Sequence, residues 1–192
     1  YMIFLNDGER SFQYWRSQSA ARRLANDLSA LEAAGAEDMV YFSGITMAIL
    51  TPEARGHLLA AISEARRAGA KVAYDPNVRP ALWADNSAIA AGIEQAAKVA
   101  DIALPTFDDD AKVFGDKDAA EMAKRYQGYG VSEVVIKDGP KSATVVSPSG
   151  TVNVAAEEVA KVVDATGAGD SFAGTYLSAR LSGKSPEEAA RR

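Results

Sequence analysis

Four short runs of mainly apolar residues recur along the chain, at positions 39–42, 71–74, 102–104 and 133–137. Each of the first three runs is followed by a turn and then by a stretch with apolar residues at helical spacing, whereas the fourth is followed by an expected hairpin over residues 143–154. Strands that alternate with helices in this way form βαβ units, and βαβ units build a parallel, twisted sheet covered on both faces. The sequence therefore predicts the α/β class, with three layers and a mostly parallel central sheet.

The first sixteen residues do not fit this pattern. Apolar and aromatic residues flank an Asp-Gly turn, which indicates a β-hairpin. Its second strand would place Phe12, Tyr14 and Arg16 on one face, where they could bind a polyol or a carboxylate, or form an ordinary sheet surface. We expect residues 1–16 to form a small β lid and residues 17–192 to form the α/β core.

A glycine turn stands between an apolar run and a helical pattern at residues 162–174. Small residues at 167–169 let backbone N–H groups converge, and a helix N-terminus adds unpaired N–H groups and a positive dipole end. Such a site binds phosphate or a developing oxyanion. Asp170 would lie in the first turn, either as a general base or only as a complement to the helix dipole. The spacing matches neither a Walker loop nor the dinucleotide pattern G-x-G-x-x-G.

A polar loop with two prolines, residues 75–83, follows the run at 71–74. Its position after a strand places it at the carboxyl edge of the sheet, where open α/β folds bind ligands. The single histidine, His57, borders the apolar stripe of its helix, and we expect no catalytic or metal role for it.

The bulk properties exclude several classes of function. The chain has 192 residues, a formal net charge of −5 and no cysteine, so disulfides and thiolate metal sites are excluded. The acidic balance argues against a nucleic-acid partner, and no apolar run has the ~18 residues of a membrane span. We expect a cytoplasmic protein without a membrane partner. Because the chain begins without Met and ends within a helical pattern, we also expect a fragment of a longer protein.

The string Asp164-Ala165-Thr166-Gly167-Ala168-Gly169-Asp170 resembles the C-terminal signature of the ribokinase (PfkB-type) carbohydrate kinases, apart from Ala165 in place of threonine. The resemblance implies a ribokinase-like fold and Asp170 as the catalytic base.

Three further strings are similar to the 2-keto-3-deoxygluconate kinases of this family: Tyr14-Trp15-Arg16, Ser43-Gly44-Ile45 and the loop at 75–83. This similarity implies transfer of the ATP γ-phosphoryl group to the 6-hydroxyl of that sugar acid, with ATP and Mg²⁺ as cofactors.

The resemblance also implies a role for each matched position. The catalytic group is Asp170 with the backbone of Gly167, Ala168 and Gly169. The substrate-binding group is Tyr14, Trp15, Arg16, Ile45, Arg79 and Asp170. The nucleotide-binding group is Asn77, Arg79, Lys137, Gly139, Ser142, Gly167 and Gly169.

The chain departs from the family pattern in three places. The Asn-x-x-Glu motif is replaced by Pro105-Thr106-Phe107-Asp108, so no metal ligand is assigned, although Asp108 could act through water. Ser142 stands where the nucleotide motif usually has glycine. The N-terminal Gly-Gly substrate loop and the C-terminal helix beside the adenine have no counterpart.

Two alternatives remain at this stage. One is a kinase for a neutral sugar such as fructose or ribose, and the other is an inactive nucleotide- or sugar-binding relative. The paired arginines favour a sugar acid, and the intact Asp170 favours an enzyme. Exposed aromatic residues such as Phe4 and Trp15 would allow the flap to pair with a second subunit.

Overall fold

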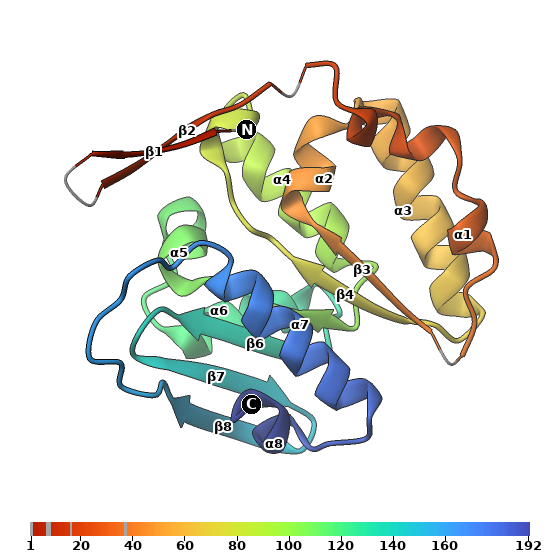
Figure 1. Ribbon diagram of the computed structural model, residues 1–192. Coiled ribbons are helices and arrows are strands. Elements are labelled where there is room, and N and C mark those ends of the chain that lie inside the picture. Colours follow the sequence, from red (N-terminus) through yellow and green to blue (C-terminus); the bar gives the residue numbers. More distant parts are fainter. Residues whose placement is uncertain (1, 7–8, 16, 37) are drawn as a thin grey trace.

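The computed structural model describes residues 2–6, 9–15, 17–36 and 38–192, and within them a six-stranded sheet carries helices on both faces (Figure 1). The strand order is β3-β4-β5-β6-β7-β8. The strands are β3 (Met39–Ser43), β4 (Lys71–Asp75), β5 (Ile102–Ala103), β6 (Glu133–Asp138), β7 (Ser142–Ser147) and β8 (Gly150–Ala155). The helices are η1 (Ala20–Asn26), α1 (Ser29–Glu32), α2 (Gly44–Ile49), α3 (Pro52–Arg67), η2 (Pro80–Leu82), α4 (Asn86–Ala97), α5 (Phe107–Phe114), α6 (Ala119–Gly128), α7 (Ala168–Leu181) and α8 (Pro186–Ala190).

The sheet is parallel in one half and antiparallel in the other. β3, β4, β5 and β6 pair in parallel, whereas β6, β7 and β8 pair antiparallel through short turns. The predicted α/β class and mostly parallel sheet are confirmed. The carboxyl ends of β4 and β6 lie at the same edge of the sheet, and the start of α7 lies at this edge too (Figure 1).

Two apolar cores separate the layers. On one face, Val72, Tyr74, Val134 and Ile136 pack with residues of α3, α4 and α6. On the other face, Ala73, Val135, Tyr176 and Leu177 belong to a second core with α8. Because alternate residues of a strand point to opposite faces, Glu133, Val135 and Lys137 of β6 all face α7.

Helix boundaries are set by capping residues that the sequence displays. The Thr51 hydroxyl accepts the Ala54 amide at the start of α3, and Pro52 occupies its first turn. Ser185 and Glu188 form a capping box on α8. These predicted starts are confirmed.

Two expectations about the helices are wrong. The pattern at 19–34 predicts one helix, but η1 ends at Asn26, and Asp27 accepts hydrogen bonds from the Ser29 amide and hydroxyl at 3.1 and 2.7 Å. Such side-chain bonds compete with a continuous helix. Leu181 is the other case: its spacing places it on the apolar stripe of α7, yet it is 54 % exposed.

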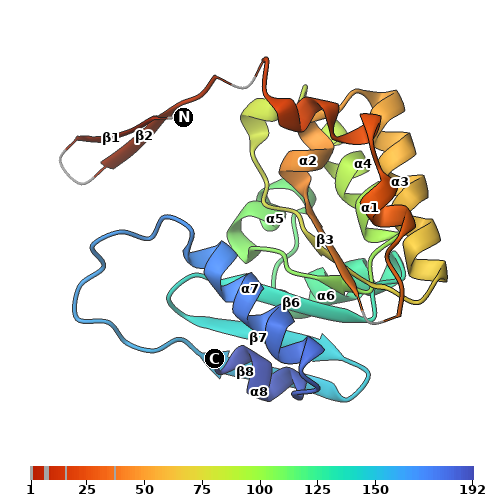
Figure 2. The same cartoon turned by 45° about the vertical axis from the view of Figure 1, so that its right-hand side comes forward.

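The predicted hairpin is present as β1 (Met2–Asn6) and β2 (Glu9–Gln13), paired antiparallel from Met2 with Gln13 to Asn6 with Glu9. In both views it stands apart from the sheet and the helices (Figures 1 and 2). Its Asp-Gly turn lies outside the described residues. β2 ends before Tyr14, so Tyr14 is not part of the strand face that the alternation predicts.

A long connection, residues 156–167, joins β8 to α7 and swings away from the body (Figure 2). All of its residues are exposed, including Val162 and Val163. The connection ends at the glycine turn, so it delivers the chain to the carboxyl edge of the sheet.

Candidate active site

The first turn of α7 holds the predicted base. Gly167 is the N-cap residue with φ 75° and ψ 5°, the left-handed conformation that glycine adopts without steric cost. α7 begins at the next residue, and Asp170 lies in its first turn with an exposed side chain. The carboxylate is therefore open to a ligand and is not locked into a buried ion pair.

The backbone N–H groups of this turn differ in their availability. The Ala168 N–H donates to the Ala165 carbonyl at 3.2 Å. No hydrogen bond to another described residue is made by the N–H groups of Gly167 and Gly169. Two of the three predicted anion-binding amides are thus free for a ligand, while Ala168 would first have to release Ala165.

The loop after β4 is held by Asp75. This side chain is 1 % exposed, and its Oδ1 accepts the Asn77 N–H at 2.9 Å. Asn77 has φ 37°, a left-handed conformation that asparagine tolerates better than most residues. A Cβ at Gly44 would lie 1.9 Å from the Pro76 carbonyl oxygen, so only glycine lets the start of α2 approach this loop.

Lys137 joins this loop to α7. Its ammonium donates to Asp75 Oδ2 at 2.6 Å, and its side chain is 13 % exposed. The same Nζ atom lies 4.0 Å from the position that a Cβ would take on Gly169. The ends of β4 and β6 and the start of α7 therefore meet around one ammonium group.

Burial raises the pKa of the Asp75 carboxyl, and the charge of Lys137 and the Asn77 amide oppose that rise. The Asp170 carboxylate raises the pKa of Asp75 further, as expected for a like charge nearby. Burial also raises the pKa of Tyr41, and the charges of Asp75 and Asp170 add to the effect. Since Tyr41 pairs with Ala73 in register, its ring lies on the α7 face of the sheet.

Arg79 and Ile45 lie around this edge, and among the described residues neither forms a hydrogen bond or an ion pair with Asp170. Arg79 is exposed, and its Nη1 donates to the neighbouring Val78 carbonyl at 2.9 Å. Ile45 is half-buried in the first turn of α2, next to Gly44, whose backbone lies close to the Pro76 carbonyl. A guanidinium with such a weak local bond is available for a ligand.

The hairpin residues are separate from the sites above. Tyr14 and Trp15 are exposed just after β2, and Arg16 lies outside the described residues. In Figures 1 and 2 the hairpin stands away from α7, so this arrangement does not bring the lid residues to Asp170.

The other predicted nucleotide and metal positions lie in nearby turns. Gly139, with φ 52°, lies in the tight turn between β6 and β7, and Ser142 is the first residue of β7. Asp108 is exposed in the first turn of α5. Among the described residues, no three His, Asp or Glu side chains gather in a way that could hold a metal ion. Mg²⁺ that arrives with a nucleotide needs only one or two carboxylates besides phosphate and water, so an exposed carboxylate fits that role.

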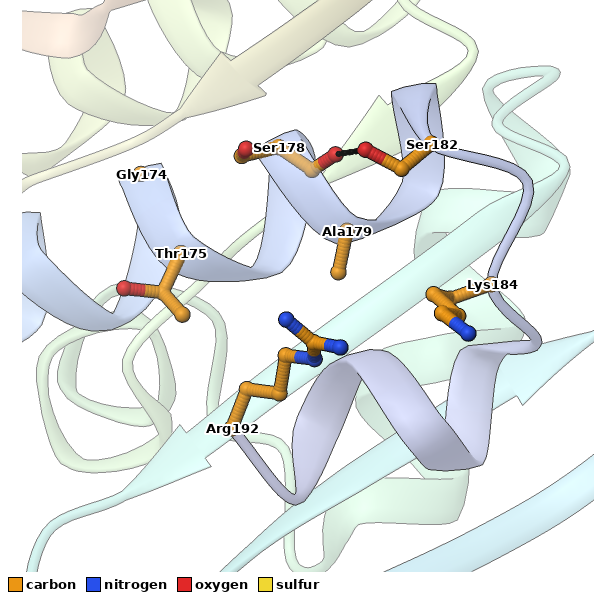
Figure 3. A pocket seen from close by; sticks show the side chains of 7 residues that line it. All are labelled: Gly174, Thr175, Ser178, Ala179, Ser182, Lys184 and Arg192. Atoms are coloured by element: carbon orange, nitrogen blue, oxygen red, sulfur yellow. Dashed lines mark hydrogen bonds between the residues drawn. The ribbon is translucent and has the colours of Figure 1, made fainter.

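A hollow of about 320 Å³ lies elsewhere on α7 (Figure 3). Thr175, Ser178 and Ser182 line it from α7, and Lys184 and Arg192 complete it. Asp170 is not among its lining residues. The hollow is therefore separate from the predicted site.

Within the described residues, no helix is both long and apolar enough to span a membrane.

Sequence reasoning assigned no functional role to two residues at this edge of the sheet. Asp75 appears in the polar loop but received no role, and Tyr41 appears only as part of a strand. The available signal for Asp75 is an acidic residue at the end of a fully apolar strand, since such an acid is rarely buried without a partner.

Comparisons with known proteins identify the family. The sequence model of the pfkB family carbohydrate kinases matches residues 1–192. The 2-dehydro-3-deoxygluconokinase of Escherichia coli K12 is 41 % identical over 191 residues, which cover 96 % of this chain and 62 % of that protein. The chain thus spans less than two thirds of this curated relative.

Solved structures show the same architecture. A PfkB protein from Polaromonas sp. JS666 is 29 % identical, with a TM-score of 0.85 over 98 % of this chain and 62 % of its own. A putative Ribokinase II from E. coli, solved with ATP and Mg²⁺, is 22 % identical, with a TM-score of 0.81 over 98 % of this chain and 60 % of its own, and bears on the fold alone. The ribokinase-like fold is confirmed, and the chain belongs to the pfkB family of carbohydrate kinases.

Proposed function

We propose that the chain carries the catalytic part of an ATP-dependent kinase that converts 2-keto-3-deoxygluconate to its 6-phosphate. The observation that carries the proposal is the exposed Asp170 carboxylate at a glycine turn, beside unpaired amides and an ammonium group. Family membership and the 41 % identity to a 2-dehydro-3-deoxygluconokinase, a synonym for the same activity, support the substrate class.

Asp170 accepts the proton of the primary hydroxyl as that oxygen attacks the γ-phosphorus. Its exposed position lets a sugar reach the carboxylate directly. The amides of Gly167 and Gly169 stabilise the charge that develops on the transferring group, and Ala168 joins them once it releases the Ala165 carbonyl.

The substrate residues supply contacts suited to a sugar acid. Arg79 and Arg16 offer guanidinium groups, which bind carboxylate in a bidentate manner. Tyr14, Trp15 and Ile45 provide an apolar and hydroxyl surface for the carbon chain. Closure of the hairpin over the edge of the sheet would bring its residues to the sugar and exclude water.

The nucleotide residues lie in the loop after β4, at the end of β6 and at the connection from β6 to β7. Asn77, Lys137, Gly139 and Ser142 would contact ATP together with the glycine turn of α7. Mg²⁺, when bound with the nucleotide, supplies charge neutralisation at the phosphates, and Asp108 would hold it through water.

The substitution Asp170→Asn tests the base. We expect turnover with ATP, Mg²⁺ and 2-keto-3-deoxygluconate to fall roughly 10²–10⁴-fold, because general-base catalysis contributes about this much. The readout is ADP release in a coupled assay. Glu187→Gln is the matched control, since Glu187 is also an exposed acid in a first turn, that of α8. Near-normal turnover by Asp170→Asn would remove Asp170 from catalysis.

A substrate panel tests the sugar. We expect 2-keto-3-deoxygluconate to be preferred over fructose and ribose in kcat/KM, and Arg79→Met to weaken the sugar acid more than the neutral sugars. Equal use of acids and neutral sugars would replace the sugar-acid assignment with the neutral-sugar alternative.

A further inference from the structure

Asp75 is the buried acid of the catalytic edge, and nothing above assigns it a task. We propose that Asp75 is a positioning residue that fixes the Lys137 ammonium beside the start of α7, so that this ammonium meets the transferring phosphoryl group. The inference rests on the proposed kinase function and adds a residue to it.

The contacts of Asp75 divide between two ligand-binding segments. One carboxylate oxygen accepts the Lys137 ammonium at 2.6 Å, and the other accepts the Asn77 amide at 2.9 Å. Lys137 lies in β6 and Asn77 in the loop after β4, 60 residues apart in the numbering (137 − 77). A single side chain therefore sets the relative position of two predicted nucleotide contacts.

The ammonium retains binding capacity after this contact. A lysine ammonium has three donors, and Asp75 is its one hydrogen-bond partner among the described residues. Its Nζ lies 4.0 Å from the Cβ position of Gly169, next to the free amides of the turn. The two remaining donors are thus held where phosphate oxygens would lie on those amides.

A second buried acid, on the strand that carries Lys137, provides the contrast. Glu133, at the start of β6, accepts Tyr176 at 2.7 Å and Arg180 at 2.9 and 2.8 Å. Arg180 also donates to the Lys184 carbonyl. This network lies at the other end of α7 and uses its donors on protein groups, as a structural ion pair does. In the pair of Asp75 and Lys137, by contrast, the ammonium keeps two unused donors beside the predicted anion site.

Removing the charge of Asp75 should separate binding from chemistry. Without the carboxylate, the site is more positive, so the affinity for ATP should not fall. The ammonium, however, is no longer held in place, and misplacement of such a group by about 1 Å can cost roughly 10²-fold in rate. The predicted signature is a fall in kcat with no rise in the KM for ATP.

The experiment uses Asp75→Asn, Lys137→Met, the double variant and the control Glu133→Gln. Asn keeps the size of the side chain and an acceptor for Asn77. We expect Asp75→Asn to lower kcat roughly 10- to 100-fold, and the double variant to be no slower than Lys137→Met. Glu133→Gln should lower the thermal midpoint yet keep kcat, since it acts only on folding. If circular dichroism shows that Asp75→Asn does not fold, the kcat values of Lys137→Gln and Lys137→Met are compared with that of the wild type instead.

A binding measurement adds a readout that does not depend on turnover. Lys137→Met should weaken ATP roughly 10-fold by calorimetry, as expected for loss of a charged hydrogen bond, and leave adenosine unchanged. Equal losses for ATP and adenosine, or unchanged kcat in Asp75→Asn, would overturn the inference and leave the proposed function intact. A wild-type protein that binds ATP but phosphorylates no sugar would overturn the proposed function, while the ATP and adenosine comparison would still decide whether Lys137 meets phosphate.

Discussion

The two ends of α7 are built for different purposes. At its C-terminal half, Tyr176 and Arg180 bind the buried carboxylate of Glu133, and the ion pair is closed by protein groups. At its N-terminal end, Gly167, Gly169 and Asp170 are exposed, and two of the amides are free of described partners. One end fixes the helix to the sheet, and the other presents unpaired groups to a ligand.

Strand β6 connects the two ends. Glu133 at its start and Lys137 at its end share the face that carries α7, because alternate residues of a strand point the same way. Each residue forms a largely buried ion pair. The difference teaches that burial alone does not identify a functional charge; what marks Lys137 as a candidate is the donors that it leaves unused beside the predicted anion site.

Arg180→Met should have the largest effect on stability. The substitution leaves Glu133 buried without its ionic partner, which costs about 3 kcal/mol of unfolding free energy. Urea denaturation measures this loss. Arg191→Met is the matched control, because Arg191 forms an exposed pair with Glu187 and its loss should be near zero. Equal, small changes in both variants would mean that Glu133 does not anchor α7.

Asp110 is a buried acid with no role at α7, and the pH dependence of the free energy of unfolding tests the effect of its burial. Burial raises the pKa of Asp110 to about 6, although hydrogen bonds from Tyr126 and Arg125 oppose the rise. The folded state thus binds the proton more tightly than the unfolded state, for which the pKa is about 3.9. The stabilisation from this proton is present below pH 4 and is lost as the pH rises through about 6, at roughly 2–3 kcal/mol in total.

Asp110→Asn isolates this contribution. We expect the stability of the variant relative to wild type to increase between pH 4.5 and 7, as measured by urea denaturation at each pH. A constant difference across this range would mean that Asp110 titrates near its ordinary pKa.

Much of the fold follows from local signals in the sequence. The apolar runs identify β3, β4 and β6, while Thr51 and Ser185 mark helix starts through their own hydrogen bonds. The turn at Gly167 is also local, since small residues between an apolar run and a helical pattern indicate a turn that leads into a helix. The signals that predict these elements come from residues that are close together in the sequence.

The main feature that the sequence did not predict depends on contacts between segments that are distant along the chain. The bond between Asp75 and Lys137 joins positions 62 residues apart (137 − 75), and no local pattern pairs them. The exposure of Leu181 depends on what covers α7, and the break at Asp27 on a side-chain bond that competes with the helix. The residue pattern at 167–170 indicated an anion site with a candidate base, the family resemblance supplied the role of each residue, and the placement of the lid residues near Asp170 stays a prediction.

The smallest expected effect concerns the backbone at the open end of α7. Gly167→Ala places a Cβ on a residue with φ 75°, a left-handed conformation that costs an L-residue about 1–2 kcal/mol. Gly174→Ala is the matched control within the same helix: Gly174 has open space around its Cβ position, and alanine should stabilise the helix by roughly 0.5–1 kcal/mol. Thermal unfolding should therefore shift in opposite directions. Kinase turnover should fall for Gly167→Ala alone, because a strained turn no longer directs its amides toward the phosphoryl group. A shift of the same sign in both variants would mean that the turn relaxes to another conformation, and the contrast between the two ends of α7 would then rest on the Glu133 and Lys137 ion pairs only.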